Sequence, residues 1–359
     1  MNVDDYLTRR FSEFVACAHP GSGVGAPRVP YRWQCRLMLY VARHGRWPDR
    51  IVAPTAAGKT SVIDIHVFLN AMAGLQHQAD TEPDLRGTDG IAYADALEQV
   101  PLHRIPRRLV LTVNRRSLVD DQYEEAVALE RVIMTGTENG SDESATVLEE
   151  FRHGLRLRAG IGVSGQITGD GAPLRVVELR GGLASTPESR EWRYYPQTCT
   201  VVCATPDMFG SRLLFRGYGI SRTMRSLEAG LLAYDTVLVA DEAHLSRQLV
   251  VTARQVQRIE SMADCDSVRT ALTPLQVVET TATPAAADDS ETCLESVGIE
   301  ESDFGVDESL GRRLCTPKWA FVDRTATAQR QLLQAIVDRC VALVQENTAY
   351  EGEREGRVV

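Results

Sequence analysis

The sequence of 359 residues predicts an α/β fold with a mainly parallel sheet. Short β-rich runs alternate along the chain with helical patterns, as they do in βαβ units. The β-rich runs are continuously apolar rather than alternating, which is typical of strands covered by helices on both faces. The expected strands are 51–53, 109–113, 174–179, 200–204, 236–240 and 276–280.

Helical periodicity lies between and after these strands. The last expected helix is the clearest, because apolar residues recur along it every three or four positions. The expected helices are 32–43, 60–73, 117–132, 146–157, 206–215, 247–262 and 326–346. Two stretches rich in Gly, Asp, Glu, Pro and Thr, about 75–106 and 136–171, are interpreted as surface insertions. The acidic, small-residue stretch from about 285 to 310 is interpreted as a connector between domains.

Composition excludes several classes of protein. No apolar run approaches the roughly 18–20 residues of a membrane span, and the acidic N-terminus lacks the pattern of a secretory signal. The eight cysteines form no Cys-x-x-Cys pair, so we expect reduced thiols and a cytoplasmic location without membrane contact. The net charge of −10 is unlike that of proteins that coat nucleic acid through bulk charge, although a local basic groove remains compatible with it.

Lysine is nearly absent from the sequence. There are 37 arginines and only two lysines, Lys59 and Lys318. Lys59 lies in a run that follows an apolar strand and precedes an apolar-periodic helix, Ala53-Pro54-Thr55-Ala56-Ala57-Gly58-Lys59-Thr60. In that context, small residues let backbone N–H groups face phosphates, and the helix N-terminus adds positive charge. A compact ammonium suits the space between phosphates better than a guanidinium does.

The run predicts a phosphate-binding loop that holds ATP. Lys59 would reach the β- and γ-phosphates, and the Thr60 hydroxyl would hold Mg²⁺. The strict pattern is not met, because Ala53 replaces its first glycine and Ala56 replaces a common glycine, so a chance turn is the alternative. The ATP-binding residues expected in and directly after this run are Pro54, Thr55, Ala56, Ala57, Gly58, Lys59, Thr60 and Ser61.

Two adjacent carboxylates end another apolar strand. The run 235–244 delivers Asp241 and Glu242 to the edge at which open parallel sheets bind ligands. Asp241 would hold Mg²⁺ through its water shell, and Glu242 would polarise the attacking water. The alternative is an ordinary strand end. With Lys59, these two residues are the predicted catalytic set.

Hydroxyls follow the next apolar strand. The run 279–284 carries Thr281 and Thr283, separated by alanine, which would relay the state of the γ-phosphate. An ordinary helix cap or a hydroxyl turn is the alternative explanation for these two threonines.

In order and spacing, these three runs resemble motifs I, II and III of superfamily 2 helicases of the DEAH type. The resemblance implies a first RecA-like ATP-binding domain over 31–285, after an N-terminal segment, 1–30. A connector over 286–313 and the beginning of a second, truncated RecA-like domain over 314–359 would follow. It also implies that Gln34 contacts the adenine edge and that His244 couples the ATP site to nucleic acid.

Three further runs look like the motifs that line the nucleic-acid groove in that family. They lie at 111–116, 178–182 and 204–208. Their arginines would bind phosphates, and a Gly-Gly turn or a helix N-terminus would offer N–H groups. For each arginine, a solvated surface charge is the alternative. The expected nucleic-acid residues are Arg115, Arg116, Arg180, Gly181, Thr205 and Asp207.

The amino-acid sequences of the runs 209–219, 229–232 and 241–246 resemble those of the helicase–nuclease of type I CRISPR systems, in the branch of subtype I-U, also called I-G. That resemblance implies an ATP-driven motor on single-stranded DNA in antiviral defence, recruited by a guide-RNA effector complex. No His-Asp dipeptide is present, so we expect no nuclease site of the HD type in this chain.

An arginine-finger motif from a second domain is also not found, so we expect slow ATP hydrolysis by this chain alone. Two other functions remain open. The chain could be another superfamily 2 motor, either an RNA helicase or a DNA translocase. It could instead be a nucleotide-responsive nucleic-acid-binding module without turnover.

Overall fold

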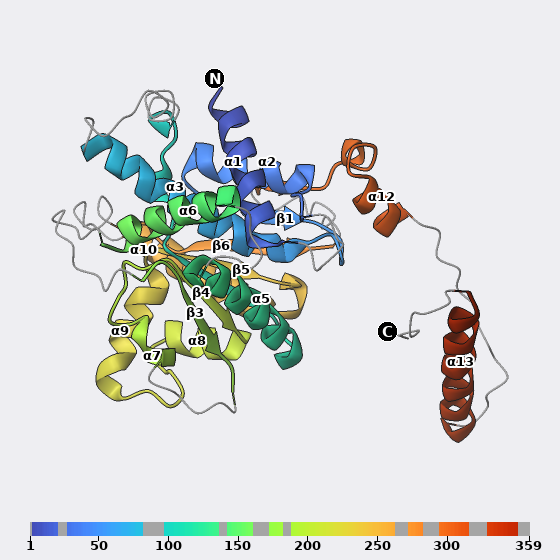
Figure 1. Cartoon of the computed structure of the whole chain (residues 1–359). Helices are drawn as coiled ribbons and strands as arrows, with labels where there is room; N and C mark the ends of the chain where they lie inside the picture. Colours follow the sequence, from blue (N-terminus) through green and yellow to red (C-terminus); the bar gives the residue numbers. More distant parts are fainter. Residues whose placement is uncertain are drawn as a thin grey trace. The chain divides into compact units, whose positions relative to one another are not determined.

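The computed structural model describes residues 2–20, 27–81, 97–135, 142–160, 172–181, 188–262, 272–282, 294–315 and 329–350. By internal contacts the chain divides into two units, Met1–Leu314 and Cys315–Val359. In the described residues of the first unit, helices surround a sheet (Figure 1).

The sheet has seven strands, all of them parallel, in the order β3-β4-β2-β5-β6-β1-β7. Their bounds are β1 Arg50–Val52, β2 Arg108–Thr112, β3 Arg175–Leu179, β4 Thr200–Ala204, β5 Thr236–Ala240, β6 Gln276–Thr281 and β7 Ser296–Gly298. The six expected strands are all present, with each end within one residue of the prediction. The predicted α/β class with a parallel sheet flanked by helices is therefore confirmed.

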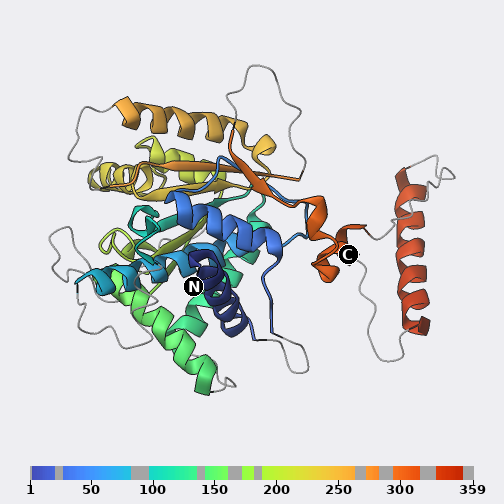
Figure 2. The same cartoon turned by 90° about the horizontal axis from the view of Figure 1, so that it is seen from above.

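Helices cover both faces of the sheet, as the view from above shows (Figure 2). One face packs against α1 Val3–Ala18, α2 Arg32–His44, α3 Val62–Thr81, α5 Arg116–Thr135 and α6 Asp142–Gly160. The other packs against α8 Pro206–Leu213, α9 Arg222–Ala233 and α10 Arg247–Met262. Neighbouring strand residues serve different cores, because side chains alternate along a strand: Leu109 and Leu111 join the first core and Val110 the second.

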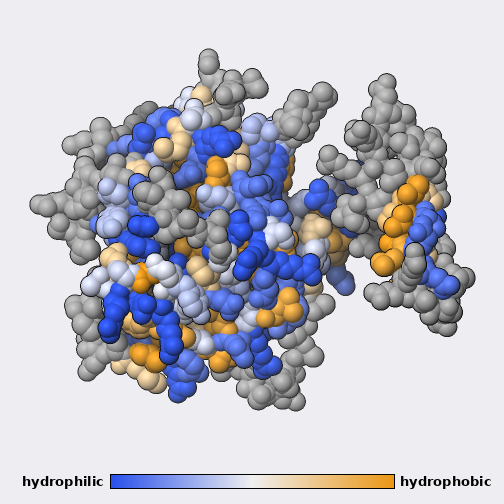
Figure 3. All heavy atoms as spheres, turned by 90° about the horizontal axis from the view of Figure 1, so that it is seen from below, coloured by the Kyte–Doolittle hydropathy of each residue, from blue (hydrophilic) through white to orange (hydrophobic). Residues whose placement is uncertain are grey.

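Shorter elements complete the described chain. They are α7 Glu188–Glu191, α12 Glu308–Cys315 and the 3-10 turns η1 Lys59–Ser61, η3 Leu102–Arg104, η4 Ala243–Leu245 and η5 Glu301–Asp303. The second unit contributes α13 Gln329–Tyr350. Apolar side chains form a stripe along α13, visible as the orange surface in Figure 3 and made of Leu332, Leu333, Ile336, Val337 and Val341. In the described part of the chain, no helix combines the length and apolarity needed to cross a membrane.

Helix α6 belongs to the core, although it lies inside the expected insertion 136–171. Its Phe151 is fully buried and packs against Phe14 of α1 and Phe68 of α3, with ring centroids 5.0 and 5.6 Å apart. The helix expected over 146–157 is therefore present, and the assignment of its segment to a surface insertion is wrong, because polar residues around its apolar face made it resemble one. Of the first expected insertion, 75–106, residues 82–96 lie outside the described residues.

The segment expected as a connector, 286–313, belongs to the first unit, and its described residues contain a strand and helical turns. Strand β7 pairs with β1, and the guanidinium of Arg36 on α2 donates to both carboxylate oxygens of Asp303, at 3.1 and 2.7 Å. Asp303 is fully buried, so its charge needs this partner. The acidic composition of the segment concealed both the strand and the ion pair. The domain boundaries, including a second RecA-like domain from 314, stay predictions.

Candidate nucleotide and nucleic-acid site

The three runs expected to carry the chemistry meet at one edge of the sheet. Val52 of β1 lies opposite Thr281 of β6, and Ala240 of β5 lies opposite Glu279 of β6. Because all strands are parallel, their carboxyl ends emerge on the same side, the edge that binds ligands in open α/β sheets. The carboxyl ends of β1, β5 and β6 are therefore neighbours in space.

The predicted phosphate-binding loop, residues 53–60, has a left-handed backbone at two positions. Ala56 has φ 66° and Gly58 has φ 78°, both in the left-handed region. Gly58 is required for a second reason, since a Cβ at that position would lie 2.8 Å from Nε2 of Gln34. In this conformation the Cβ of Ala56 lies close to the following carbonyl oxygen, a steric strain that glycine would avoid. Alanine in place of the common glycine at position 56 therefore adds strain to the loop, and the loop still has its left-handed backbone there.

Side chains of α2 hold the loop through hydrogen bonds. Gln34 is 2% exposed, and its Nε2 donates to the carbonyl of Gly58 at 3.0 Å, while its Oε1 accepts from the N–H of Tyr31 at 2.8 Å. The indole of Trp33 donates to the carbonyl of Ala57 at 3.2 Å. Both ends of the Gln34 carboxamide are thus hydrogen-bonded within the chain. This places Gln34 as a residue that positions the loop; its contact with an adenine edge stays a prediction.

Lys59 lies between the two carboxylates that follow β5. Its Nζ is 3.3 Å from Oδ1 of Asp241 and 3.3 Å from Oε1 of Glu242. The three side chains are 15%, 25% and 29% exposed, so they are partly shielded but open to a ligand. Lys59 and Asp241 are 182 positions apart in the sequence, and only the pairing of β1, β6 and β5 brings them together.

A hydroxyl that sequence reasoning missed contacts Asp241. Thr280 is 2% exposed, and its Oγ1 donates to Oδ1 of Asp241 at 2.5 Å, while the N–H of Glu242 donates to the same oxygen at 3.1 Å. The prediction selected Thr281 and Thr283 instead. Thr281 lies beside the phosphate-binding loop, where its carbonyl accepts from the N–H of Ala53 at 3.0 Å. Thr283 lies outside the described residues.

The side chains here fit a phosphate-bound magnesium ion. Thr60 and Asp241 line the same cavity of about 430 Å³, and the buried Oγ of Ser61 has no hydrogen-bond partner in the structure as described. Within the described ranges, no three metal-ligating side chains form a preformed cage. Mg²⁺ is commonly held by one or two carboxylates together with substrate phosphates, so the donor set suits that ion. Two basic residues that the prediction omitted, Arg28 and Arg313, also line the cavity.

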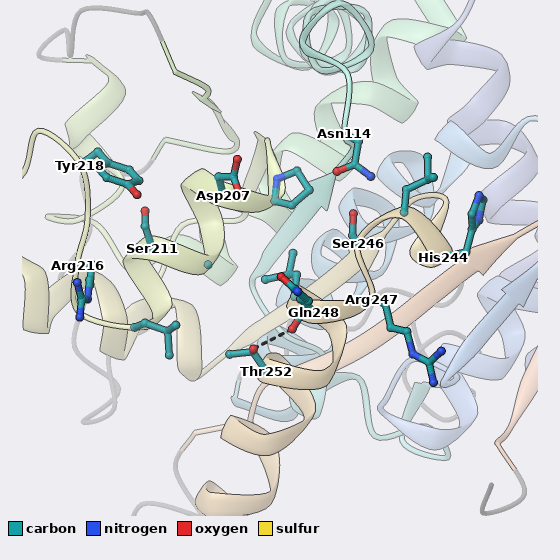
Figure 4. Close-up of a pocket in the computed structure, with 15 residues that line it drawn as sticks. Asn114, Asp207, Ser211, Arg216, Tyr218, His244, Ser246, Arg247, Gln248 and Thr252 are labelled. Carbon is teal, nitrogen blue, oxygen red and sulfur yellow. Dashed lines mark hydrogen bonds between the residues drawn. The ribbon is translucent and has the colours of Figure 1, made fainter.

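His244 is 64% exposed and lies near Glu242, with 3.5 Å between its Nδ1 and Oε2 of the carboxylate. Glu242 itself has φ 47°, a left-handed conformation that is strained for a residue with a side chain. This strained turn directs Glu242 toward Lys59 and leaves the imidazole of His244 at the surface, beside the pocket of Figure 4. The expected coupling role of His244 stays a prediction.

The residues expected to contact nucleic acid follow three adjacent strands. Arg115 and Arg116 follow β2, Gly181 follows β3, and Thr205 and Asp207 follow β4. Both arginines are exposed. Arg116 lies beside Gly181, since its Nη2 is 3.4 Å from the position that a Cβ on this glycine would occupy. Thr205 caps α8, and its N–H donates to the carbonyl of Leu179 at 3.1 Å. The sheet order thus groups these positions on one side of the phosphate-binding loop.

Arg180 differs from the other expected phosphate ligands. Its Nε lies 2.5 Å from Oε1 of Glu178 and 2.7 Å from Oδ1 of Asp120. The hydrogen bond to Glu178 holds the pKa of Arg180 above its usual value. A phosphate at Arg180 would have to compete with these two carboxylates. Arg115 and Arg116 have no ion pair among the residues that the structure describes, so they are the stronger candidates.

No family model matches the chain, and no curated protein matches it. Among solved structures, the chain is similar to the yeast DEAD-box splicing factor Prp28, with 19% sequence identity and a TM-score of 0.35. The similarity covers 76% of this chain and 46% of that one, so the chain spans less than half of the structure it matches.

Proposed function

We propose that the chain binds ATP with Mg²⁺, hydrolyses it and couples this to single-stranded nucleic acid, as an ATP-dependent motor does. One observation carries the proposal. The single described lysine lies 3.3 Å from two adjacent carboxylates, at the end of a loop with a left-handed backbone and at the ligand-binding edge of a parallel sheet.

The residues have distinct roles in this proposal. Lys59 binds the β- and γ-phosphate oxygens and gives up its contacts with Asp241 and Glu242 in doing so. Glu242 orients the attacking water, which displaces ADP from the γ-phosphoryl group in line. Gln34 and Trp33 keep the loop in its curled form. Thr60 and Asp241 would hold Mg²⁺, which neutralises charge on the phosphate oxygens.

The finer proposal rests on sequence resemblance. We infer that the substrate strand is DNA and that the chain is the motor part of a CRISPR-associated helicase–nuclease, recruited by a guide-RNA effector complex. The order of motifs, with the wording of 209–219, supports this inference. An RNA helicase, another DNA translocase or a nucleotide-dependent binder are the competing assignments.

Nucleotide binding and turnover by the full chain test the proposal. A fluorescent ATP analogue should bind in the presence of Mg²⁺, and Lys59→Ala should abolish binding. Glu242→Gln should keep binding and lower phosphate release by at least about 100-fold. Because no arginine finger was identified, the basal rate is expected to be slow, so single-turnover conditions with excess protein are appropriate.

Three outcomes separate the assignments. Stimulation by single-stranded DNA over RNA supports the DNA motor, and stimulation by RNA alone supports an RNA helicase. Equal and unmeasurable turnover in the wild type and Glu242→Gln, with nucleotide-dependent strand binding, supports a binder. Wild-type protein that binds no nucleotide would contradict the proposal.

A further inference from the structure

The turn after α8 displays apolar side chains to solvent. Within five residues, Leu214 is 52% exposed, Phe215 60% and Tyr218 67%. This turn, residues 214–219, lies in the run whose wording carries the family resemblance but which has no part in ATP chemistry. We propose that the turn is a base-stacking platform that binds unpaired bases of a single-stranded nucleic acid through Phe215 and Tyr218.

The platform is rigidly held. The carbonyl of Ser211 accepts from the N–H groups of Arg216 and Gly217, at 2.7 and 2.9 Å. Phe215 has φ 60°, a strained conformation that persists only where the surroundings enforce it. A turn whose backbone is already formed lowers the cost of ordering the chain at the moment of binding.

A buried ion-pair cluster anchors the base of the turn. Arg212 is 6% exposed, and its Nε lies 3.1 Å from Oε2 of the fully buried Glu228, which also pairs with Arg193. Burial raises the pKa of Glu228 against the opposing effect of the two arginines. Breaking such a cluster leaves a buried charge without a partner, so the end of α8 is fixed to α9.

A pocket of about 610 Å³ adjoins the turn and connects it to the expected nucleic-acid residues (Figure 4). Asp207, Ser211 and Tyr218 lie on one side of the pocket, and Ser246 and Gln248 on the other. Asn114, which directly precedes Arg115, lines it from the segment after β2. A strand held at Arg115 would therefore have this pocket beside it, with Tyr218 in its lining.

Charge favours nucleic acid over a protein as the occupant. Arg216 and Arg247 line the pocket and are exposed, with no ion pair to either in the described part of the chain, and Asp207 is the single carboxylate of the lining. In a chain of net charge −10, this is a local basic surface beside the exposed ring of Tyr218, and the exposed ring of Phe215 belongs to the same turn. Aromatic rings with nearby arginines are the combination that binds single strands irrespective of sequence.

This inference rests on the proposed function, and its test separates the two. Binding of the full chain to a labelled 20-nucleotide oligothymidylate is compared with binding to an abasic strand of equal length. The double variant Phe215→Ala/Tyr218→Ala should weaken binding to oligothymidylate by about 10- to 100-fold and leave the abasic strand unaffected. Phe215→Trp/Tyr218→Trp should retain the preference for bases.

A control variant, Arg115→Ala/Arg116→Ala, should weaken binding to both strands alike, because it removes phosphate contacts. If the aromatic double variant binds both strands like the wild type, the platform is overturned while the motor proposal stands. If the wild type binds neither strand, both fail. An unchanged affinity for the ATP analogue verifies that the aromatic double variant is folded.

Discussion

Thr280 shows how one hydroxyl can orient a carboxylate, that of Asp241. Replacing it with valine keeps the shape and removes the donor to Oδ1 of Asp241, which keeps the N–H of Glu242 and the ammonium of Lys59 as partners. We expect Thr280→Val to bind the ATP analogue normally and to release phosphate about tenfold more slowly, since one hydrogen bond to a charged group is worth about 1.5 kcal/mol or more. Thr280→Ser should restore the rate.

Thr281→Val is the comparison variant, because its side chain points to the opposite face of β6 and its hydroxyl is the one that the sequence predicts to relay the state of the γ-phosphate. Equal losses of rate in both variants would mean that the hydroxyl of Thr280 has no role of its own.

Glu260 on α10 makes stability depend on pH. Burial at 7% exposure raises the pKa of Glu260 to about 7, although its carboxylate accepts from the N–H of Leu275 at 3.0 Å. The folded protein thus holds a proton that the unfolded chain releases near pH 4.5. The stabilisation is complete below about pH 4.5 and is lost as pH rises toward 7, by on the order of 3 kcal/mol in total.

Glu260→Gln should remove this slope, because the amide oxygen still accepts from Leu275 and carries no charge. Urea unfolding at pH 5 and pH 8 measures it. The variant is expected to match the wild type at pH 5 and to be more stable at pH 8. If the stability of the variant depended on pH as strongly as that of the wild type, this assignment would be contradicted.

At the scale of elements, two glycines let helices α3 and α6 pack backbone to backbone. A Cβ at Gly154 would lie 2.4 Å from the carbonyl oxygen of Ala71, and one at Gly74 would lie 1.9 Å from that of Gly154. Neither obstacle is a flexible side chain. We expect Gly154→Ala to destabilise the protein by about 2–3 kcal/mol, since the helices must move apart in a packed core.

Gly230 is the matched control, because it lies inside α9 with no atom within 4 Å of the position of a Cβ. Gly230→Ala should stabilise the protein by up to about 1 kcal/mol through helix propensity. Thermal and urea unfolding of the two variants should therefore change in opposite directions. A stable Gly154→Ala protein would mean that α6 packs less closely than described.

At the scale of the whole molecule, an acidic protein must bind an acidic polymer through a local basic surface. Nucleic-acid affinity should therefore fall as salt concentration rises, because each neutralised phosphate releases counterions. The variant Arg115→Ala/Arg116→Ala is expected to reduce the slope of log affinity against log salt by about 1.4 for a single strand, at about 0.7 per phosphate contact. Binding titrations at salt concentrations from about 50 to about 200 mM, where the effect is large, would measure this slope. An unchanged slope would remove these two arginines from the interface.

Much of the strand pattern was predictable, because buried parallel strands are short, continuously apolar and flanked by turns. The helices α1 and α9 were missed, and α6 was predicted as a helix over 146–157 but was assigned to a surface insertion. Their apolar faces are interrupted by charged residues, and what decides their burial is the distant partner, as for Phe151 of α6 against Phe68 of α3. The three-residue strand β7 was also missed, since nothing local distinguishes so short a run in an acidic stretch.

The sequence by itself determined which residue types can act on a phosphate: a rare lysine after a loop of small residues, and two carboxylates at a strand end. These signals are local, so they survive without coordinates. Only the tertiary structure decided which groups touch, because strand order is a long-range property. In the structure, Thr280 rather than Thr281 donates to Asp241, and Gln34 donates to the carbonyl of Gly58. Arg180 pairs with two carboxylates. Side-chain direction and charge pairing depend on neighbours that are remote in the chain.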